Sequence, residues 1–310
     1  SITYEIFNMM NRRLFLKKAC GGVLVLAASP SFVSCGGQRP VRFGVVTDLH
    51  YSRREPYGTR YFPQTMDKLK EAMEVFNSSN LDFVIEMGDL KDQDNVPRRE
   101  QTITYLDEIE NVFQSFRGPV YHVLGNHDMD SISKDDFLQH TSNQGDADKK
   151  AYYSFAFDNI KFIVLDANYN LDGTPYDKGN FDWTKAYIPK DQIDWLKKEL
   201  KGNNKPVIIF IHQLLDRFSD ISKSLCVSNA DEIVPLLEEN GNVLAVFQGH
   251  HHAGHYSFRN NIHYWTMKGM IEGNLPDNNS FAVVEIDTQN NIHIDGFYNC
   301  EDKDLNRFTV

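Results

Sequence analysis

Four histidines lie close together in the stretch Phe247–Tyr256, which reads FQGHHHAGHY. Imidazole is a good ligand for Mn, Fe and Zn. In extended backbone, residues two positions apart point to the same side, so His250 and His252 can face one site while His251 points away. The nearby His255 could face a substrate at that site. If this stretch is more than a polar loop without ligands, other parts of the chain must complete the site.

Carboxylate, amide and imidazole side chains follow short apolar segments elsewhere in the chain. Asp48 and His50 follow residues 41–47 (VRFGVVT), and Asp89 follows residues 82–87 (DFVIEM). Asn126 follows residues 120–124 (VYHVL), and His212 follows residues 207–211 (VIIFI). These segments are rich in Val, Ile and Phe and too short for buried helices, so we expect strands. Open α/β sheets place their ligands at the carboxyl ends of strands, so these side chains should meet at one edge. Their mixture of donors, without clustered thiolates, favours Mn, Fe or Zn.

The elements that must position these residues alternate along the chain. Further strands are predicted at residues 161–165 and 243–247, and helices at 65–76, 104–116, 192–200 and 230–239, the last capped by Asn229. Such alternation predicts a layered α/β fold. Segments 261–268, 280–286 and 291–297 read as successive strands, which suggests a second sheet packed beside the first. The long segment 168–187 should cross the surface, and whether it covers the site stays open.

The first 35 residues differ from the rest of the chain. A basic stretch (NRRLFLKK, 11–18) precedes an apolar one and then small residues up to Cys35, which is the order of a secretory signal. The pair Arg12 and Arg13 resembles a twin-arginine signal, and residues 32–35 resemble a lipoprotein processing site. We therefore expect a leader at 1–35, a single domain at 36–310, and export to a periplasmic or lipid-anchored location.

Composition limits the classes of partner. The chain has 310 residues, of which 41% are hydrophobic, enough for a substantial core. Its formal net charge of −11 argues against a nucleic-acid partner. An anionic substrate would need local positive charge, which a bound metal can supply. Beyond the leader, Cys226 and Cys300 remain, and their pairing cannot be decided from sequence.

The ordered motifs DxH, GDxxD, GNHD, a lone His and GHxH, from Asp48 to His252, resemble the calcineurin-like metallophosphoesterase superfamily. The resemblance implies an α/β fold in which two mixed β-sheets pack as a sandwich flanked by helices. It also implies two divalent metal ions, Mn²⁺ first and Fe or Zn as alternatives. The implied ligands are Asp48, His50 and His252 for one ion, Asn126, His212 and His250 for the other, and Asp89 as the bridge. His127 would protonate the leaving group and Asp128 would orient His127, while Asp92 either supports the ligands from behind or caps a helix.

The resemblance also bears on the reaction. It implies that a hydroxide shared by the two metals attacks phosphorus in line. Gln93 stands where protein Ser/Thr phosphatases of the superfamily carry Arg, so that branch is disfavoured. Residues 249–256 and 262–273 resemble the manganese-dependent ADP-ribose/CDP-alcohol diphosphatases, which often have Gln in place of His50. This likeness implies a nucleotide-derived substrate with a phosphoanhydride bond.

Two other functions stay open at this point. Export favours a phosphate-scavenging enzyme, either a cyclic-nucleotide phosphodiesterase or a broad phosphomonoesterase. A lipoprotein that binds metal or phosphate without turnover is the remaining class, but such a protein should have lost a catalytic residue, and His127 is present together with every ligand position. The exact substrate, the native metal pair and the oligomeric state are not specified by the sequence.

Overall fold

The computed structural model describes residues 38–306. The expected leader at residues 1–35, with Arg12, Arg13 and Cys35, lies outside the described residues. Among the described residues, no helix has both the length and the apolar character that a membrane span requires. Cys226 and Cys300 are both buried, and no disulfide joins them to each other.

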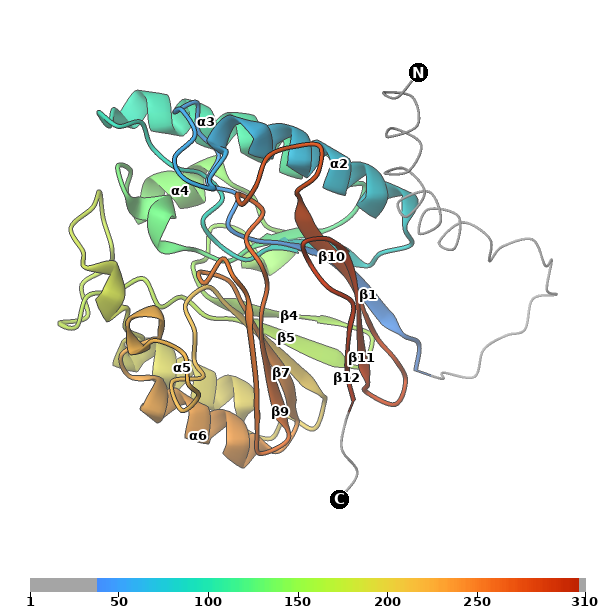
Figure 1. Cartoon of the computed structure of the whole chain (residues 1–310). Helices are drawn as coiled ribbons and strands as arrows, with labels where there is room; N and C mark the ends of the chain where they lie inside the picture. The colour runs from blue at the N-terminus through green and yellow to red at the C-terminus, as the bar shows by residue number, and fades with distance from the viewer. Residues whose placement is uncertain (1–37, 307–310) are drawn as a thin grey trace, which may run out of the picture.

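Two six-stranded mixed sheets form the centre of the molecule (Figure 1). In the first, the order is β12-β11-β10-β1-β2-β3, and β1, β2 and β3 run parallel. In the second, the order is β4-β5-β6-β7-β9-β8, with β5, β6, β7 and β9 parallel. The first sheet comprises β1 (Val41–Val46), β2 (Phe83–Glu86), β3 (Val120–His122), β10 (Ser280–Ile286), β11 (Ile292–Tyr298) and β12 (Lys303–Leu305). The second comprises β4 (Tyr153–Phe157), β5 (Ile160–Val164), β6 (Val207–Ile211), β7 (Val243–Gln248), β8 (His255–Arg259) and β9 (Ile262–Thr266).

Helices flank the pair of sheets on both outer sides (Figure 1). On the side of the first sheet lie α2 (Thr65–Ser78), α3 (Arg99–Phe113) and α4 (Lys134–His140). On the side of the second lie α5 (Lys190–Leu200) and α6 (Ala230–Asn240). Phe76 of α2 packs edge-on against Phe281 of β10, with 5.8 Å between ring centroids. The predicted fold, two mixed sheets in a sandwich flanked by helices, is confirmed.

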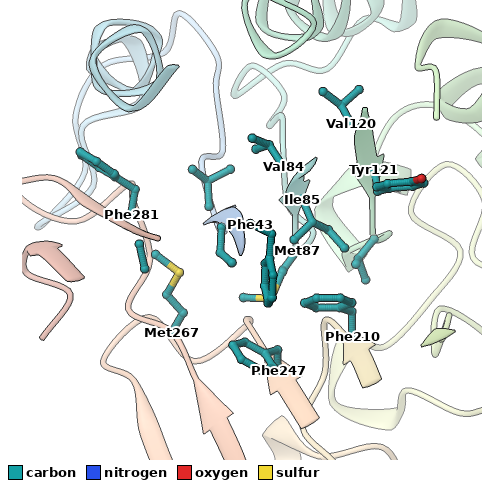
Figure 2. Close-up of a cluster of buried hydrophobic side chains, with 14 of the residues drawn as sticks. Phe43, Val84, Ile85, Met87, Val120, Tyr121, Phe210, Phe247, Met267 and Phe281 are labelled. Carbon is teal, nitrogen blue, oxygen red and sulfur yellow. The ribbon is translucent and has the colours of Figure 1, made fainter. Parts of the chain in front are cut away.

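The space between the sheets is filled by aromatic and aliphatic side chains (Figure 2). Phe43 of β1 meets Phe210 of β6 and Phe247 of β7 across the interface, at 5.7 and 5.9 Å between ring centroids. All three rings are fully buried. Because this core joins the two sheets, it also determines how their strand ends are placed relative to each other.

The last strands of the chain are placed differently from the expectation. They do not form a sheet of their own, because β10 pairs antiparallel with β1 and β9 pairs parallel with β7. Strands β1 and β7 are buried, so each needs a hydrogen-bonded neighbour on either side. Strands β4, β8 and β12 were not anticipated. Asn229 precedes α6 as predicted, but its side-chain amide bonds the backbone of Ile188 (3.0 and 2.9 Å) and does not cap the helix.

Candidate metal centre

The seven predicted metal ligands come together where the parallel strands of both sheets end. Asp48 and His50 follow β1, Asp89 follows β2, and Asn126 follows β3 in the first sheet, whereas His212 follows β6 and His250 and His252 follow β7 in the second. The ligand atoms of Asp48, His50 and His252 all lie within 4.8 Å of one another, and so do those of Asp89, His212 and His250. Two potential metal-binding groups therefore lie side by side.

Asp89 lies between the two groups. Its Oδ2 atom is 3.1 Å from His212 Nε2 and 3.5 Å from His50 Nε2. In the first group, His252 Nε2 lies 3.3 Å from Asp48 Oδ1 and 3.1 Å from His50 Nε2. This placement matches the bridging position that the motif resemblance implies for Asp89.

Four of the expected ligand atoms are buried without a hydrogen-bond partner: Asp48 Oδ1, Asn126 Oδ1, His212 Nε2 and His250 Nε2. Buried polar atoms are nearly always paired, because an unpaired one forfeits its hydration. Carboxylate, amide and imidazole atoms converging in this way suit divalent transition metals. The residues present therefore fit two metal ions.

The backbone at the ligands is conformationally unusual. Asp48, His50, Asp89 and His250 all have positive φ, between 48° and 67°. This left-handed region costs energy for residues other than glycine and is found where the surrounding structure enforces it, often at functional sites. Gly125 shows how closely the chain packs here, because a Cβ atom at that position would collide with the backbone and carboxylate of Asp89. The loops after β2 and β3 are thereby held against each other.

Three of the imidazole ligands are oriented from behind. His212 Nδ1 donates to the Met87 carbonyl (2.8 Å), His252 Nδ1 to Glu272 (2.7 Å), and His50 Nδ1 to Asp92 (3.2 Å). A hydrogen bond at Nδ1 leaves the Nε2 lone pair free for a metal. Asp92 thus supports the site, and it does not cap a helix, since α3 begins at Arg99.

His127 lies at the wall of the site, with 34% of its side chain exposed. Its Nδ1 atom is 3.5 Å from Asp92 and 3.9 Å from Asp130. In the metal-free protein, burial disfavours the charged imidazole, but the carboxylates of Asp89, Asp92 and Asp130 outweigh it and raise the pKa of His127 to about 9. The position of His127 at the wall of the site, with Nδ1 facing carboxylates, suits a role as proton donor.

Asp128 is placed differently from the expectation that it orients His127. Its carboxylate accepts backbone N–H bonds from Asp89 (3.0 Å), Leu90 (3.0 Å) and Gly125 (2.7 Å). The short 3₁₀ turn at Asn126–Met129 directs this side chain towards the backbone of the loops after β2 and β3. The carboxylates beside the His127 ring are instead those of Asp92 and Asp130.

The comparisons with known proteins agree with this geometry. Residues 41–254 match the family described as Calcineurin-like phosphoesterase. The chain belongs to this family. The predicted superfamily is thus confirmed, and with it the prediction of a metal-dependent phosphoesterase.

Individual relatives of this phosphoesterase are distant. The chain is 25% identical over 286 residues to a manganese-dependent ADP-ribose/CDP-alcohol diphosphatase of Arabidopsis thaliana, covering 79% of this chain and 90% of that protein. It is 26% identical over 233 residues to a 3′,5′-cyclic-nucleotide phosphodiesterase of Nostoc, covering 73% and 76%. The fold matches a dimetal phosphatase from Danio rerio with a TM-score of 0.73 at 20% identity, covering 86% and 99%.

A cavity of about 560 Å³ opens above the metal ligands of the phosphoesterase. Trp183, from the long 168–187 segment, and Leu225 form an apolar part of its lining, and the Trp183 ring lies 5.6 Å from that of His250. The segment therefore forms part of the cavity wall. His255 instead turns to Ser219 (3.1 Å) and Asp216 (3.4 Å) in the loop after β6.

Glu272 was not connected with the metal centre by the sequence pattern. It holds His252, and this contact, although opposed by burial, lowers the pKa of Glu272 to about 2 in the metal-free protein. Conversely, burial disfavours charge on His252, but Asp48 and Glu272 outweigh it and raise its pKa to about 9. The available signal was a carboxylate within residues 262–273, the segment that resembles the diphosphatases.

Proposed function

We propose that the protein is a manganese-dependent phosphohydrolase that cleaves the phosphoanhydride bond of nucleoside diphosphate derivatives, such as ADP-ribose or CDP-alcohols. The observation that carries the proposal is the pair of ligand groups, with unpaired buried ligand atoms, at the base of an open cavity. The names and the extent of the diphosphatase relatives support this substrate class. Iron or zinc could occupy the same ligands, because the donor set is mixed.

The ligands would divide between two ions as the motifs imply. Asp48, His50 and His252 would hold one ion, Asn126, His212 and His250 the other, and Asp89 would contact both. When bound, two divalent ions supply positive charge for a phosphoryl group and lower the pKa of coordinated water. The carboxylates of Asp48 and Asp89 offset part of that charge and leave an excess that attracts phosphate to an acidic protein.

His127 would act on the leaving group. Asp92 and Asp130 face its Nδ1 atom, which leaves Nε2 for the substrate. A proton held there can pass to the departing oxygen as the bond to phosphorus breaks. Replacing His127 by Ala should therefore greatly reduce turnover with metal content unchanged, whereas a non-catalytic metal-binding protein would show no turnover in either form.

The lining of the cavity suits a nucleotide. Trp183 is 45% exposed and stands with Leu225 above His250, where a planar base can stack. A cyclic-nucleotide phosphodiesterase is the second candidate, favoured by the Nostoc relative. Both candidates share the metal centre and differ in the bond that is cleaved.

Product analysis distinguishes the two candidates. The protein is stripped of metal, reloaded with Mn²⁺ and offered ADP-ribose, a CDP-alcohol, cyclic AMP and 4-nitrophenyl phosphate in parallel. We expect AMP and ribose 5-phosphate from ADP-ribose as the dominant products. Preferential cleavage of cyclic AMP or of the monoester would refute the anhydride assignment.

Export is part of the same proposal. The basic, apolar and small residues before Cys35 support secretion followed by lipid attachment to that cysteine. Labelling cells with a radioactive fatty acid should mark the protein but not its Cys35→Ala variant. Recovery of the unlabelled, uncleaved chain in the cytoplasmic fraction would contradict this proposal.

A further inference from the structure

A second cavity adjoins the one above the metal ligands. It has a volume of about 350 Å³, and His252, Lys268 and Glu272 line both cavities. Its remaining lining is polar and includes Tyr298, Asn299 and Glu301. A substrate bound at the metal ligands therefore has room to extend past Lys268 on this side.

Two basic side chains, Arg60 and Lys268, line the cavity above the metal ligands together with Glu272, and Lys268 also lines the second cavity. Arg60 Nε lies 3.9 Å from Glu272 Oε1, which is longer than a hydrogen bond. Lys268 Nζ lies 3.0 Å from Glu301, whose side chain is 82% exposed. The exposed Lys268 pair contributes little stability, and the Arg60 contact is too long for a hydrogen bond, so both cations can turn to an anionic ligand at small cost.

We propose that Arg60 and Lys268 bind the phosphoryl group of the substrate that is not held at the metal ligands. This inference rests on the proposed function, and it assigns the recognition of a second phosphate to two residues. The group attached to that phosphate then extends into the second cavity. Arg60 and Lys268 thereby select diphosphate derivatives over esters that contain one phosphate.

Charge explains why a second phosphate needs its own partners. The protein carries a formal charge of −11, and Glu272 and Glu301 lie at this end of the cavity. Metal ions would neutralise the phosphoryl group that they contact, but a second phosphate beside these carboxylates would be repelled. Guanidinium and ammonium groups form charge-assisted hydrogen bonds with phosphate oxygens and offset that repulsion.

The test compares two substrates in matched variants of the full chain. Arg60→Gln and Lys268→Gln are made singly and together, and Lys190→Gln is the control, because Lys190 forms an exposed ion pair with Asp194 on α5. For the double variant, we expect kcat/KM to fall about 10- to 100-fold for ADP-ribose. For bis(4-nitrophenyl) phosphate, which has one phosphate, the change should stay below about threefold. Lys268→Arg should retain the preference for ADP-ribose.

Binding provides a readout that is independent of turnover. Calorimetry should show that the wild-type protein binds α,β-methylene-ADP more tightly than AMP and that the double variant loses this preference at unchanged manganese content. An equal fall for both substrates, accompanied by metal loss, would show that Arg60 and Lys268 act only through Glu272 and would overturn the inference. If the wild-type protein cleaves ADP-ribose and the variants cleave it equally well, the second-phosphate site is refuted while the proposed function stands. If the wild-type protein left ADP-ribose intact, the proposed function would fail and this inference with it.

Discussion

Replacing Asp128 by Asn separates two roles that this carboxylate could play. The structure shows the Asp128 oxygens accepting three backbone N–H bonds in the loops that carry Asp89 and Asn126. An Asn side chain keeps one acceptor oxygen and places an amide donor where the other oxygen stood. At least one buried N–H group then loses its partner, and the others lose a charged acceptor.

The expected cost follows from these contacts. A buried N–H group left unpaired costs about 1–3 kcal/mol, and hydrogen bonds to charged groups contribute more than neutral ones. Burial and the neighbouring Asp89 carboxylate raise the pKa of Asp128 to about 6, so the loss of its charge offsets part of this cost, and we expect Asp128→Asn to lower the free energy of unfolding by about 1–3 kcal/mol. Urea unfolding of the metal-free protein, followed by circular dichroism, measures this as a shift in midpoint at unchanged slope. Metal content should also fall, because Asp89 lies in the loop that is released.

Asp92→Asn is the matched control, because Asp92 faces His127 and His50 through its side chain. This variant should reduce turnover through His127 while the backbone N–H bonds that Asp128 accepts stay intact. The reasoning about Asp128 would be refuted if Asp128→Asn kept the urea midpoint and the manganese content of the wild-type protein but lost turnover. That result would show that Asp128 acts through His127, as the motif resemblance implies.

Three further predictions follow from other contacts. Glu272→Gln should weaken manganese binding about 10- to 100-fold by calorimetric titration, because it loosens His252, whereas Glu301→Gln should not. Trp183→Ala should raise KM for ADP-ribose about tenfold and leave a substrate without a base unaffected; equal effects on both would exclude stacking. The buried pair of His122 and Glu110 (2.8 Å) should make stability pH-dependent. Burial disfavours the charged form of both residues, but the attraction between them outweighs burial. The pKa of His122 is therefore raised from 6.5, and that of Glu110 is lowered from 4.5. The stabilisation that protonated His122 contributes is complete below pH 6.5 and is lost as pH rises through the pKa of His122 in the folded protein. The stabilisation that ionised Glu110 contributes is complete above pH 4.5 and is lost as pH falls through the pKa of Glu110 in the folded protein. His122→Gln should therefore destabilise the protein by about 2–4 kcal/mol at pH 5.5 and less at pH 8, and a loss that does not change with pH would contradict the pairing.

The strand ends that meet at the metal centre could be predicted because their signal is local. An apolar run predicts a strand, and parallel strands bring their carboxyl ends to one edge whatever their order. The DxH and HxH spacings added the direction of Asp48, His50, His250 and His252. The pairing partners of β9 and β10 had no such local signal, since they depend on which buried strand is left without a neighbour.

Side-chain partners were harder to predict than strand ends. The sequence places Asp128 next to His127, but the 3₁₀ turn directs it to backbone groups, and Asp92 and Asp130 take its expected place. Glu272 reaches His252 only because the backbone after β9 is hydrogen-bonded to Thr47, Asp48 and His252. Such contacts depend on loop geometry, for which residue types alone carry little information.

The division of the ligands between two sheets has a consequence for how the protein matures. His50 and His252 are 202 positions apart in the chain, and their Nε2 atoms lie within 3.1 Å only when the sheets are packed together. A chain in which only one sheet has formed offers half a site, with little affinity for metal. Metal capture is thus a late event that stabilises the completed assembly and no earlier state. Manganese binding accordingly adds to the stability of the folded protein alone, and scarcity of the ion would leave correctly folded chains open to unfolding.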